Sequence, residues 1–277
     1  MRKKHINTIL YCCIGMYCAF SLYPFLIMLL GSFKTATDLS RNPAGLPAKW
    51  ILDNYYTLLI ANTDIIRGFM NSVFVTTSYI FSATLLCSMA AYAFAKYEFP
   101  GKEFLFILML ATMMIPKQVL LPPLYLIFAR IGWLNTYRVQ ILADAGRVFG
   151  VFMLRQYFEN IPNSVLESAR IDGARPFQVF RKLVIPMSAP ALGAFAILQF
   201  NHKWNDFLWP AIFVRDYAKM PVMVILPNLQ TMEGNEQLVP WELVLAGCTF
   251  VTIPVIIAFL LLQDKVMSSM TAGAVKE

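Results

Sequence analysis

The sequence predicts an all-α integral membrane protein with six transmembrane helices in a single domain that covers residues 1–277. Hydrophobic residues make up 58% of the positions and charged residues 14%, whereas soluble domains have about 45–50% and about 25%. Six apolar runs each have about the 20 residues that a helix needs to cross hydrocarbon. They cover residues 9–30, 73–95, 104–128, 139–158, 189–213 and 243–262.

The run at residues 9–30 follows three basic residues, Arg2, Lys3 and Lys4, and we interpret it as the first span. A secretory signal is the alternative, but Pro24 lies inside the run and no small-residue cleavage site follows it. Lys and Arg are retained on the cytoplasmic side of membranes. A cytoplasmic N-terminus places more of them inside than outside, so we expect both termini in the cytoplasm. The net charge of +7 is then a matter of topology and not of nucleic-acid binding.

Two connections follow from local sequence. Residues 34–69 form the longest external loop, and its aromatic residues Trp50, Tyr55 and Tyr56 suit a surface at the membrane interface. Residues 96–103 predict a tight cytoplasmic hairpin, because Pro100-Gly101 supplies turn residues. The second and third spans are therefore expected to be antiparallel neighbours.

The third, fourth and fifth runs contain groups that lipid does not accommodate. The third is interrupted by Pro116, Lys117, Gln118, Pro122 and Pro123, the fourth contains Asp144 and Arg147, and the fifth contains Asn201, His202, Lys203, Asn205 and Asp206. Broken helices of this kind are tolerated where protein or a wet cavity covers the backbone, and they often line transport routes.

Two interpretations of these polar groups stay open: neutralised pairs packed inside a helix bundle, or side chains that face a water-filled path. The spacing of Asp144 and Arg147 suits either one, because residues three apart are neighbours on a helix. The candidate path residues are Lys117, Asp144, Arg147, Asn201, Asn205 and Asp206.

Residues 164–184, between the fourth and fifth runs, are polar and helical in pattern. Ser164 and Glu167 match a capping box at the start of a helix. Gly173 can close that helix in the left-handed conformation, and Pro176 suits the first turn of the next. We expect two short helices at an angle, which pattern alone leaves open as a docking surface or a simple connector.

The same segment carries a specific resemblance. Glu167-Ser168-Ala169, then Gly173 after three residues, then Leu183-Val184-Ile185-Pro186 after nine more, resembles the E-A-A-x3-G-x9-I-x-L-P motif of ABC importer permeases. Further stretches resemble the carbohydrate branch of these permeases, the maltose-permease type of the carbohydrate uptake 1 family. They are residues 32–34, 99–102, 113–116, 132–136, 204–210 and 271–276. The chain departs from that pattern at Lys117 and in the charged residues 143–148, so the resemblance does not identify a substrate.

The resemblance implies a bacterial cell-membrane permease that forms half of the translocation pathway of a sugar importer. Its partners would be a second, related permease in a heterodimer, a pair of ATP-binding subunits and an extracytoplasmic sugar-binding protein. Residues 164–184 would be the coupling helix that docks on the ATPase. The contact residues carried over are Glu167, Ser168, Ala169, Asp172, Gly173 and Arg175, with Thr271, Gly273 and Lys276 in the tail as a second contact.

The chain itself is not expected to be an enzyme. No G-x-x-x-x-G-K-[ST] phosphate loop occurs in the sequence, so ATP and Mg²⁺ would bind the partner ATPase and this chain would hold no cofactor. The five cysteines have no metal-like spacing, and no metal site is expected. Two alternatives are an ABC permease for a non-sugar solute, such as a polyamine, peptide or phosphate, and an ion-coupled secondary transporter.

Overall fold

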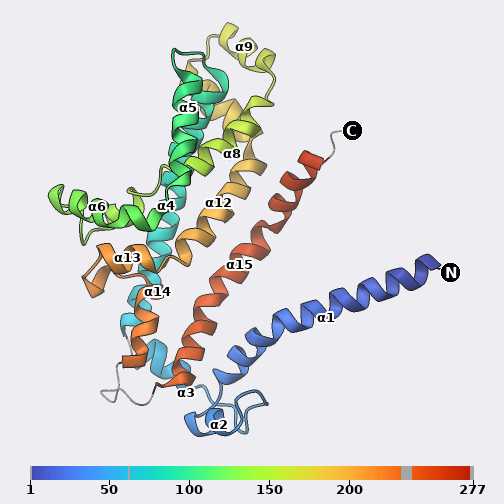
Figure 1. The fold of residues 1–277 in the computed structure, drawn as a ribbon, viewed down its shortest axis with the longest axis vertical. Coiled ribbons are helices and arrows are strands. Elements are labelled where there is room, and N and C mark those ends of the chain that lie inside the picture. Colours follow the sequence, from blue (N-terminus) through green and yellow to red (C-terminus); the bar gives the residue numbers. More distant parts are fainter. Residues whose placement is uncertain (1, 62, 232–238, 275–277) are drawn as a thin grey trace. The chain divides into compact units, whose positions relative to one another are not determined.

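The computed structural model describes residues 2–61, 63–231 and 239–274, and these residues form helices and turns without a strand. The α-helices are α1 (Arg2–Gly31), α2 (Ala36–Arg41), α3 (Asp53–Tyr56), α4 (Thr63–Lys96), α5 (Lys102–Ala111), α6 (Lys117–Arg130), α7 (Tyr137–Ile141), α8 (Val148–Glu159), α9 (Asn163–Ile171), α10 (Pro176–Val179), α11 (Ile185–Met187), α12 (Ala189–Trp204), α13 (Leu208–Phe213), α14 (Val222–Ile225) and α15 (Trp241–Ala274) (Figure 1). Short π-helical turns lie at Thr57–Ala61 and Phe180–Val184, and 3₁₀ turns lie at Thr112–Met114, Tyr217–Lys219 and Leu226–Thr231. The all-α prediction is therefore confirmed.

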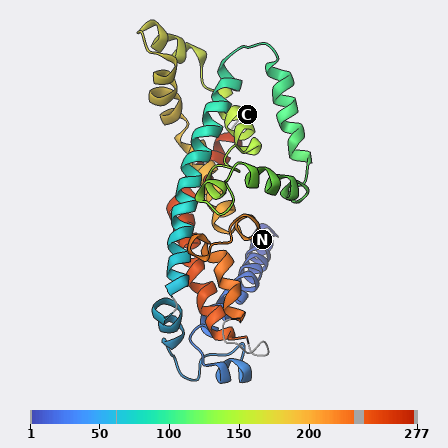
Figure 2. The same cartoon turned by 90° about the vertical axis from the view of Figure 1, so that its left-hand side faces the viewer.

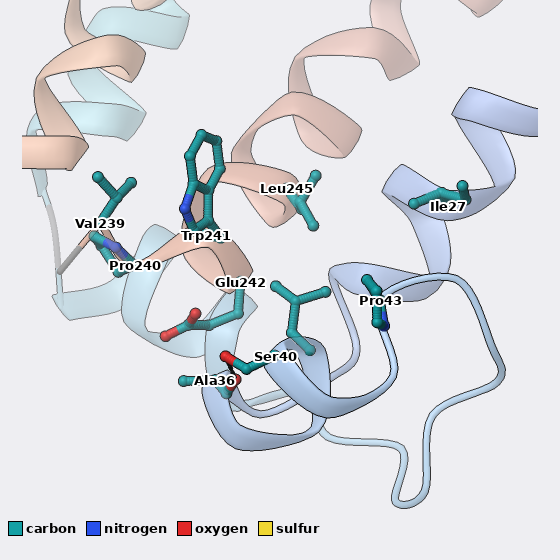
Figure 3. Close-up of a pocket in the computed structure, with 10 residues that line it drawn as sticks. Ile27, Ala36, Ser40, Pro43, Val239, Pro240, Trp241, Glu242 and Leu245 are labelled. Atoms are coloured by element: carbon teal, nitrogen blue, oxygen red, sulfur yellow. Dashed lines mark hydrogen bonds between the residues drawn. The ribbon is translucent and has the colours of Figure 1, made fainter.

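The chain divides into two compact units, one of Met1–Arg67 with Ile225–Ile253 and the other of Gly68–Val224 with Pro254–Glu277. The first unit contains α1 to α3 and the first part of α15. A hollow of about 730 Å³ opens between α2 and the start of α15, with Leu39, Trp241 and Leu245 on its walls and Glu242 at its edge (Figure 3). The expected single permease domain is a functional grouping, and it stays a prediction.

The predicted external loop at 34–69 is largely ordered by its own contacts. Lys34 is fully buried, and its Nζ donates to the carbonyl oxygen of Asn42 at 2.5 Å. The Asn54 amide donates to the carbonyl oxygens of Ser32 and Lys34 at 2.9 and 2.8 Å. The Trp50 side chain is exposed, as an interface residue would be.

The larger apolar core of the second unit collects residues from α4, α8, α12 and the α9–α11 segment. Tyr92 on α4, Phe158 on α8 and Phe195 on α12 are buried in it together with Leu166 and Val184. Buried apolar surface is the main stabilising contribution. The 164–184 segment is therefore part of the folded unit and not a free connector.

Within the part of the chain that the structure describes, three helices are long and apolar enough to cross a membrane: Leu10–Gly31 within α1, Thr63–Lys96, and Trp241–Leu261 within α15. Two bent pairs would raise this number to five if each is one span, namely Lys102–Met114 with Lys117–Arg130, and Pro176–Met187 with Ala189–Trp204. The count of six spans stays a prediction.

The run at 104–128 was predicted to be interrupted from Pro116 onward, and the structure confirms a break there. The runs at 139–158 and 189–213 were predicted as spans, and neither is a single helix. The run at 104–128 bends by 103° at Ile115-Pro116, a turn visible between α5 and α6 (Figure 1). Of its prolines only Pro116 breaks the helix, because Pro122 and Pro123 lie inside α6. The run at 139–158 is broken at residues 142–147, and the run at 189–213 is broken at residues 205–207. Apolar run length does not register such breaks, since a broken helix inside protein has the same composition as a straight one.

Candidate functional site: a helical corner and a charged cavity

The α9–α10 corner is built by local backbone geometry around Gly173, which has φ +85°. Its N–H donates to the carbonyl oxygen of Arg170, and the N–H of Ala174 donates to the carbonyl oxygen of Ala169, both at 3.0 Å. This is the Schellman pattern that closes a helix with a left-handed residue. Pro176 then occupies the first turn of α10, so both predictions are confirmed.

The capping box predicted at Ser164 and Glu167 was wrong. Helix α9 begins two residues earlier than that box requires, at Asn163, with Pro162 instead of Ser164 as its N-cap and no capping bond from a side chain. Ser164 lies inside the helix, where its carbonyl oxygen accepts from Ser168 Oγ at 2.8 Å. A capping contact forms instead at the next helix, where Gln178 Oε1 accepts from the backbone N–H of Arg175 at 2.8 Å.

One face of this corner is buried and the other is exposed. Leu166, Val179 and Phe180 pack into the core, whereas Glu167, Ser168, Asp172 and Arg175 are exposed. Ile171 and Phe177 are 86% and 59% exposed. Exposed apolar side chains beside charged ones are typical of an interaction surface. In Figures 1 and 2 the corner lies at the same end of the second unit as the α4–α5 hairpin.

A hollow of about 350 Å³ lies on the inner side of the corner. Its lining residues are Ala169, Asp172, Gly173, Ala174, Gln178, Val179, Lys182 and Leu183. Five of the predicted contact residues, Glu167, Ser168, Asp172, Gly173 and Arg175, are exposed at the corner, while Ala169 is half-buried there. The corner therefore offers both charged and apolar groups to a partner.

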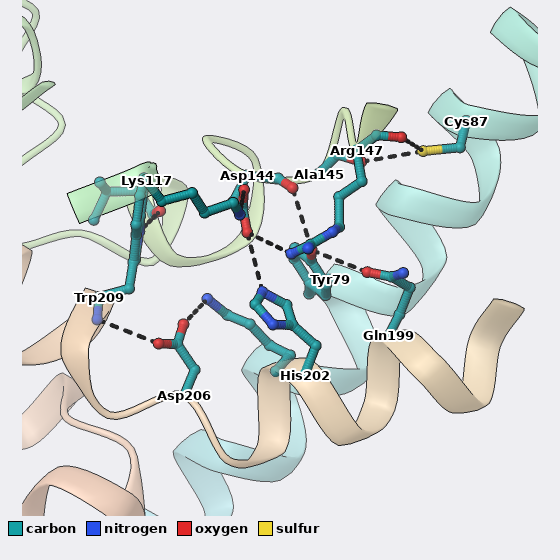
Figure 4. A network of polar contacts seen from close by, with 12 residues as sticks. Tyr79, Cys87, Lys117, Asp144, Ala145, Arg147, Gln199, His202, Asp206 and Trp209 are labelled. Atoms are coloured by element: carbon teal, nitrogen blue, oxygen red, sulfur yellow. Dashed lines mark hydrogen bonds and ion pairs between the residues drawn. The ribbon is translucent and has the colours of Figure 1, made fainter. Parts of the chain in front are cut away.

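The second feature is a network centred on Asp144, in the break between α7 and α8 (Figure 4). Its carboxylate accepts from Lys117 Nζ at 2.7 Å and from Arg147 at 3.1 Å, and it lies 3.2 Å from His202 Nε2. A carboxylate held by several donors in a low-dielectric surrounding is strongly stabilised in its charged form. The network therefore joins α6, the α7–α8 break and α12.

Side chains of α4 satisfy the backbone that this break exposes. Tyr79 Oη lies 3.2 Å from both the Asp144 carbonyl oxygen and Gln199 Oε1. Cys87 Sγ is 3.5 Å from the Ala145 carbonyl oxygen and 3.4 Å from that of Arg147. Non-helical backbone at membrane depth needs such partners.

A second ion pair lies beside the Asp144 network, and the two border one cavity. Lys203 Nζ donates to Asp206 Oδ2 at 2.8 Å, and Asp206 Oδ1 accepts from the backbone N–H of Trp209 at 3.2 Å. The Trp209 indole donates to the Val139 carbonyl oxygen at 2.8 Å. The cavity measures about 140 Å³, and its lining residues are Lys117, Gln118, Leu121, Asp144, His202, Asp206, Leu208 and Trp209. The residues that the structure describes contain no cluster of His, Cys, Asp and Glu suited to a metal ion.

Comparison with known proteins decides the family. Residues 83–271 match the family described as the binding-protein-dependent transport system inner membrane component. The chain belongs to this family.

Two curated relatives and one solved structure are similar to the permease over nearly its whole length. The arabinooligosaccharides transport system permease protein AraQ of Halalkalibacterium halodurans is 33% identical and aligned over 92% of this chain and 91% of its own length. The probable starch degradation products transport system permease protein AmyC of Thermoanaerobacterium thermosulfurigenes is 30% identical, with 100% of both chains covered. A chain of a bacterial ABC transporter involved in the import of the acidic polysaccharide alginate has the same fold, with a TM-score of 0.86, 24% identity and coverage of 95% of this chain and 98% of that one. The permease is therefore a multi-pass membrane transport subunit and not an enzyme.

The structure brings together only part of the predicted path of the permease. Lys117, Asp144 and Asp206 line the cavity, and Arg147 bonds to Asp144. Asn201 and Asn205 are exposed and bond to each other instead, with Asn205 Nδ2 2.9 Å from Asn201 Oδ1. His202 and Trp209 belong to the cavity, although sequence reasoning did not select them as path residues. The signal was present, because His202 lies in the polar run of the fifth span. As the neighbour of Asn201 it lies about 100° away around the helix and so presents a different face.

The predicted second ATPase contact lies at the end of the last helix. Thr271 and Gly273 belong to α15, and Lys276 lies outside the described residues. That contact stays a prediction.

Proposed function

We propose that this chain forms half of the translocation pathway of an ATP-driven sugar importer and that its α9–α10 corner couples the pathway to a separate ATPase. The observation that supports this coupling role is the corner itself. It has a rigid Schellman closure, a core-packed inner face, and an outer face with Glu167, Asp172 and Arg175 exposed beside Ile171. A partner that binds this face can therefore move the helices behind it as one body.

In this proposal Glu167 pairs with a basic group of the ATPase, and the exposed side chains of Ile171 and Phe177 fill a cleft of the ATPase. ATP binding changes which state of the permease the ATPase contacts best, and that difference shifts the equilibrium between outward-facing and inward-facing conformations. The corner then lies in the cytoplasm, as do both termini. A second permease would cover apolar surface such as that of α1, where no residue in the most apolar part of Leu10–Gly31 is buried.

The coupling role is tested with Glu167→Ala in the assembled transporter. We expect uptake to be lost while the variant still inserts into the membrane at the normal level. Glu98→Ala is the matched control, because Glu98 is another exposed glutamate of the predicted cytoplasmic side and bonds only to Lys102, at 2.9 Å. Full uptake by the Glu167 variant, or equal losses in both variants, would reject the coupling assignment.

The charged cavity supports a saccharide cargo. The Trp209 indole offers an aromatic surface, while Asp144, Asp206 and Gln118 offer the acceptors and donors that hydroxyl groups need. The relative AraQ is named for transport of arabinooligosaccharides and AmyC for transport of starch degradation products, which favours the same cargo class. An extracytoplasmic binding protein would deliver the sugar, in keeping with the name of the family.

The cargo is tested by measuring competition for uptake with maltotriose, arabinotriose, spermidine, a tripeptide and phosphate. We expect only the saccharides to compete. The energy source is tested separately, by comparing ATP depletion with collapse of the ion gradients at constant ATP. Loss of uptake only on collapse of the gradients would favour the ion-coupled alternative. Its candidate relay residues would be Asp144, Arg147, Lys203 and Asp206.

A further inference from the structure

Lys96, the last residue of α4, reaches across to the joint from which the α9–α10 corner extends. Its Nζ donates to the carbonyl oxygens of Glu159 and Ile161 at 3.2 and 2.6 Å and to Asn163 Oδ1 at 2.9 Å. These three acceptors lie at the end of α8, in the linker and at the first residue of α9. One ammonium group therefore joins three helices.

In this arrangement both the N–H donors of Lys96 and the last carbonyl oxygens of α8 have hydrogen-bond partners. A lysine ammonium has three N–H donors, and here each has an acceptor. The last carbonyl groups of a helix have no partner within the helix. At the end of α8 the carbonyl oxygens of Tyr157 and Phe158 accept from the backbone N–H groups of Asn160 and Ile161. The carbonyl oxygen of Glu159 accepts from Lys96. A cation at this position also interacts favourably with the negative end of the helix dipole.

Aromatic rings of α4 and of the residue that follows it also contact the corner. Tyr92 and Phe180 have ring centroids 5.3 Å apart, and the guanidinium of Arg170 lies 5.8 Å from the ring of Tyr97. Such packing holds two surfaces together but is weakly directional. Hydrogen bonds from one ammonium to two carbonyl oxygens and an amide oxygen define an orientation.

We infer that Lys96 is a positioning residue that fixes the direction of the α9–α10 corner relative to α4 and carries movement of the corner to that span. The inference rests on the proposed coupling function. It assigns to Lys96 a role that the coupling motif does not include, because Lys96 and its three acceptors all lie outside residues 164–184.

The first test uses the full chain in lipid nanodiscs and hydrogen exchange of the α9 amides. Lys96→Met removes all three bonds, so we expect the amides of residues 163–171 to exchange about tenfold faster, the factor that 1.4 kcal/mol gives. Lys102→Met is the matched control. It removes one positive charge from the same hairpin but breaks only the surface pair with Glu98, and it should leave α9 exchange unchanged. Unchanged α9 exchange in Lys96→Met, or an equal increase in the control, would overturn the inference.

The second test measures sugar uptake per ATP hydrolysed by the assembled transporter, with maltotriose as the probe. We expect Lys96→Met to lower this ratio about tenfold while ATP hydrolysis continues, and Lys96→Arg to recover part of it because a guanidinium also donates to carbonyl oxygens. Faster α9 exchange with an unchanged ratio would overturn the role in transmission and leave the proposed function standing. A normal ratio in Glu167→Ala would instead reject the proposed function and leave the exchange result to be judged separately.

Discussion

Gly173 and Gly101 form a matched pair for measuring how much transport depends on the shape of the α9–α10 corner. Both have positive φ, +85° and +79°, and a methyl group added at either one meets no atom within 4 Å. Ala at each position therefore suffers the same backbone strain without a clash. That strain is about 1–2 kcal/mol per residue in the left-handed region, which corresponds to a factor of roughly 5–30 in an equilibrium constant.

The consequences of the two substitutions differ because the two turns hold different structures. At Gly173 the strain acts on the two 3.0 Å bonds that close α9 onto α10, so we expect Gly173→Ala to reduce uptake about 5–30-fold. At Gly101 the strain acts on the α4–α5 hairpin, and we expect uptake within about twofold of the unsubstituted transporter. Gly173→Asn should retain more uptake than Gly173→Ala, because Asn is enriched at positive φ.

The assay is the initial rate of uptake at equal amounts of membrane-inserted transporter, together with thermal stability of each purified chain. Similar losses of stability in the two alanine variants would show that the strain is matched. Equal uptake by Gly173→Ala and the unsubstituted transporter, or an equal fall in Gly101→Ala, would refute the reasoning that corner shape controls transport.

Two further predictions concern stability of the chain in detergent. Gly150→Ala should lower the melting temperature, since the new methyl group would lie 2.4 Å from the Phe195 ring and overpacking costs about 1–3 kcal/mol. Gly15→Ala adds a methyl group with no atom within 4 Å, and it should leave the melting temperature equal or higher because Ala favours helix by up to about 1 kcal/mol. A lower melting temperature for Gly15→Ala would count against this account. Asp144→Asn should destabilise by about 1–3 kcal/mol, because it leaves partly exposed cations without their anionic partner. Glu98→Gln, at a glutamate whose side chain is exposed, should cost less than about 1 kcal/mol. Equal melting temperatures for the two variants would show that the network contributes no more than a surface pair.

Local sequence predicted the α9–α10 corner well because its geometry depends on adjacent residues. A glycine followed by a proline three residues later restricts the backbone whatever surrounds it, and Gly173 and Pro176 behave as expected. The start of α9 was less predictable. Ser164 competes with Pro162 for the N-cap position, and the turn that enters from α8 places Pro162 there.

The charged groups were found by composition, but their partners were not. Asp144 and Arg147 do pair, three residues apart, as predicted. The bonds to Lys117 and His202 join residues 27 and 58 positions away, and no periodicity relates positions so distant. The same holds for Lys96, whose three acceptors lie more than 60 positions along the chain.

The sequence alone determined that the chain is a helical membrane protein, because apolar content and run length are properties of composition that any fold must respect. It also determined the turn chemistry at Gly173 and the motif around Glu167, which are local. Only the tertiary structure decided that the fourth and fifth apolar runs break at residues 142–147 and 205–207, which charges meet at Asp144, and that Lys96 holds the end of α8 and the start of α9. Those outcomes depend on which distant groups arrive to satisfy exposed backbone and buried charge, and that is settled only when the helices pack.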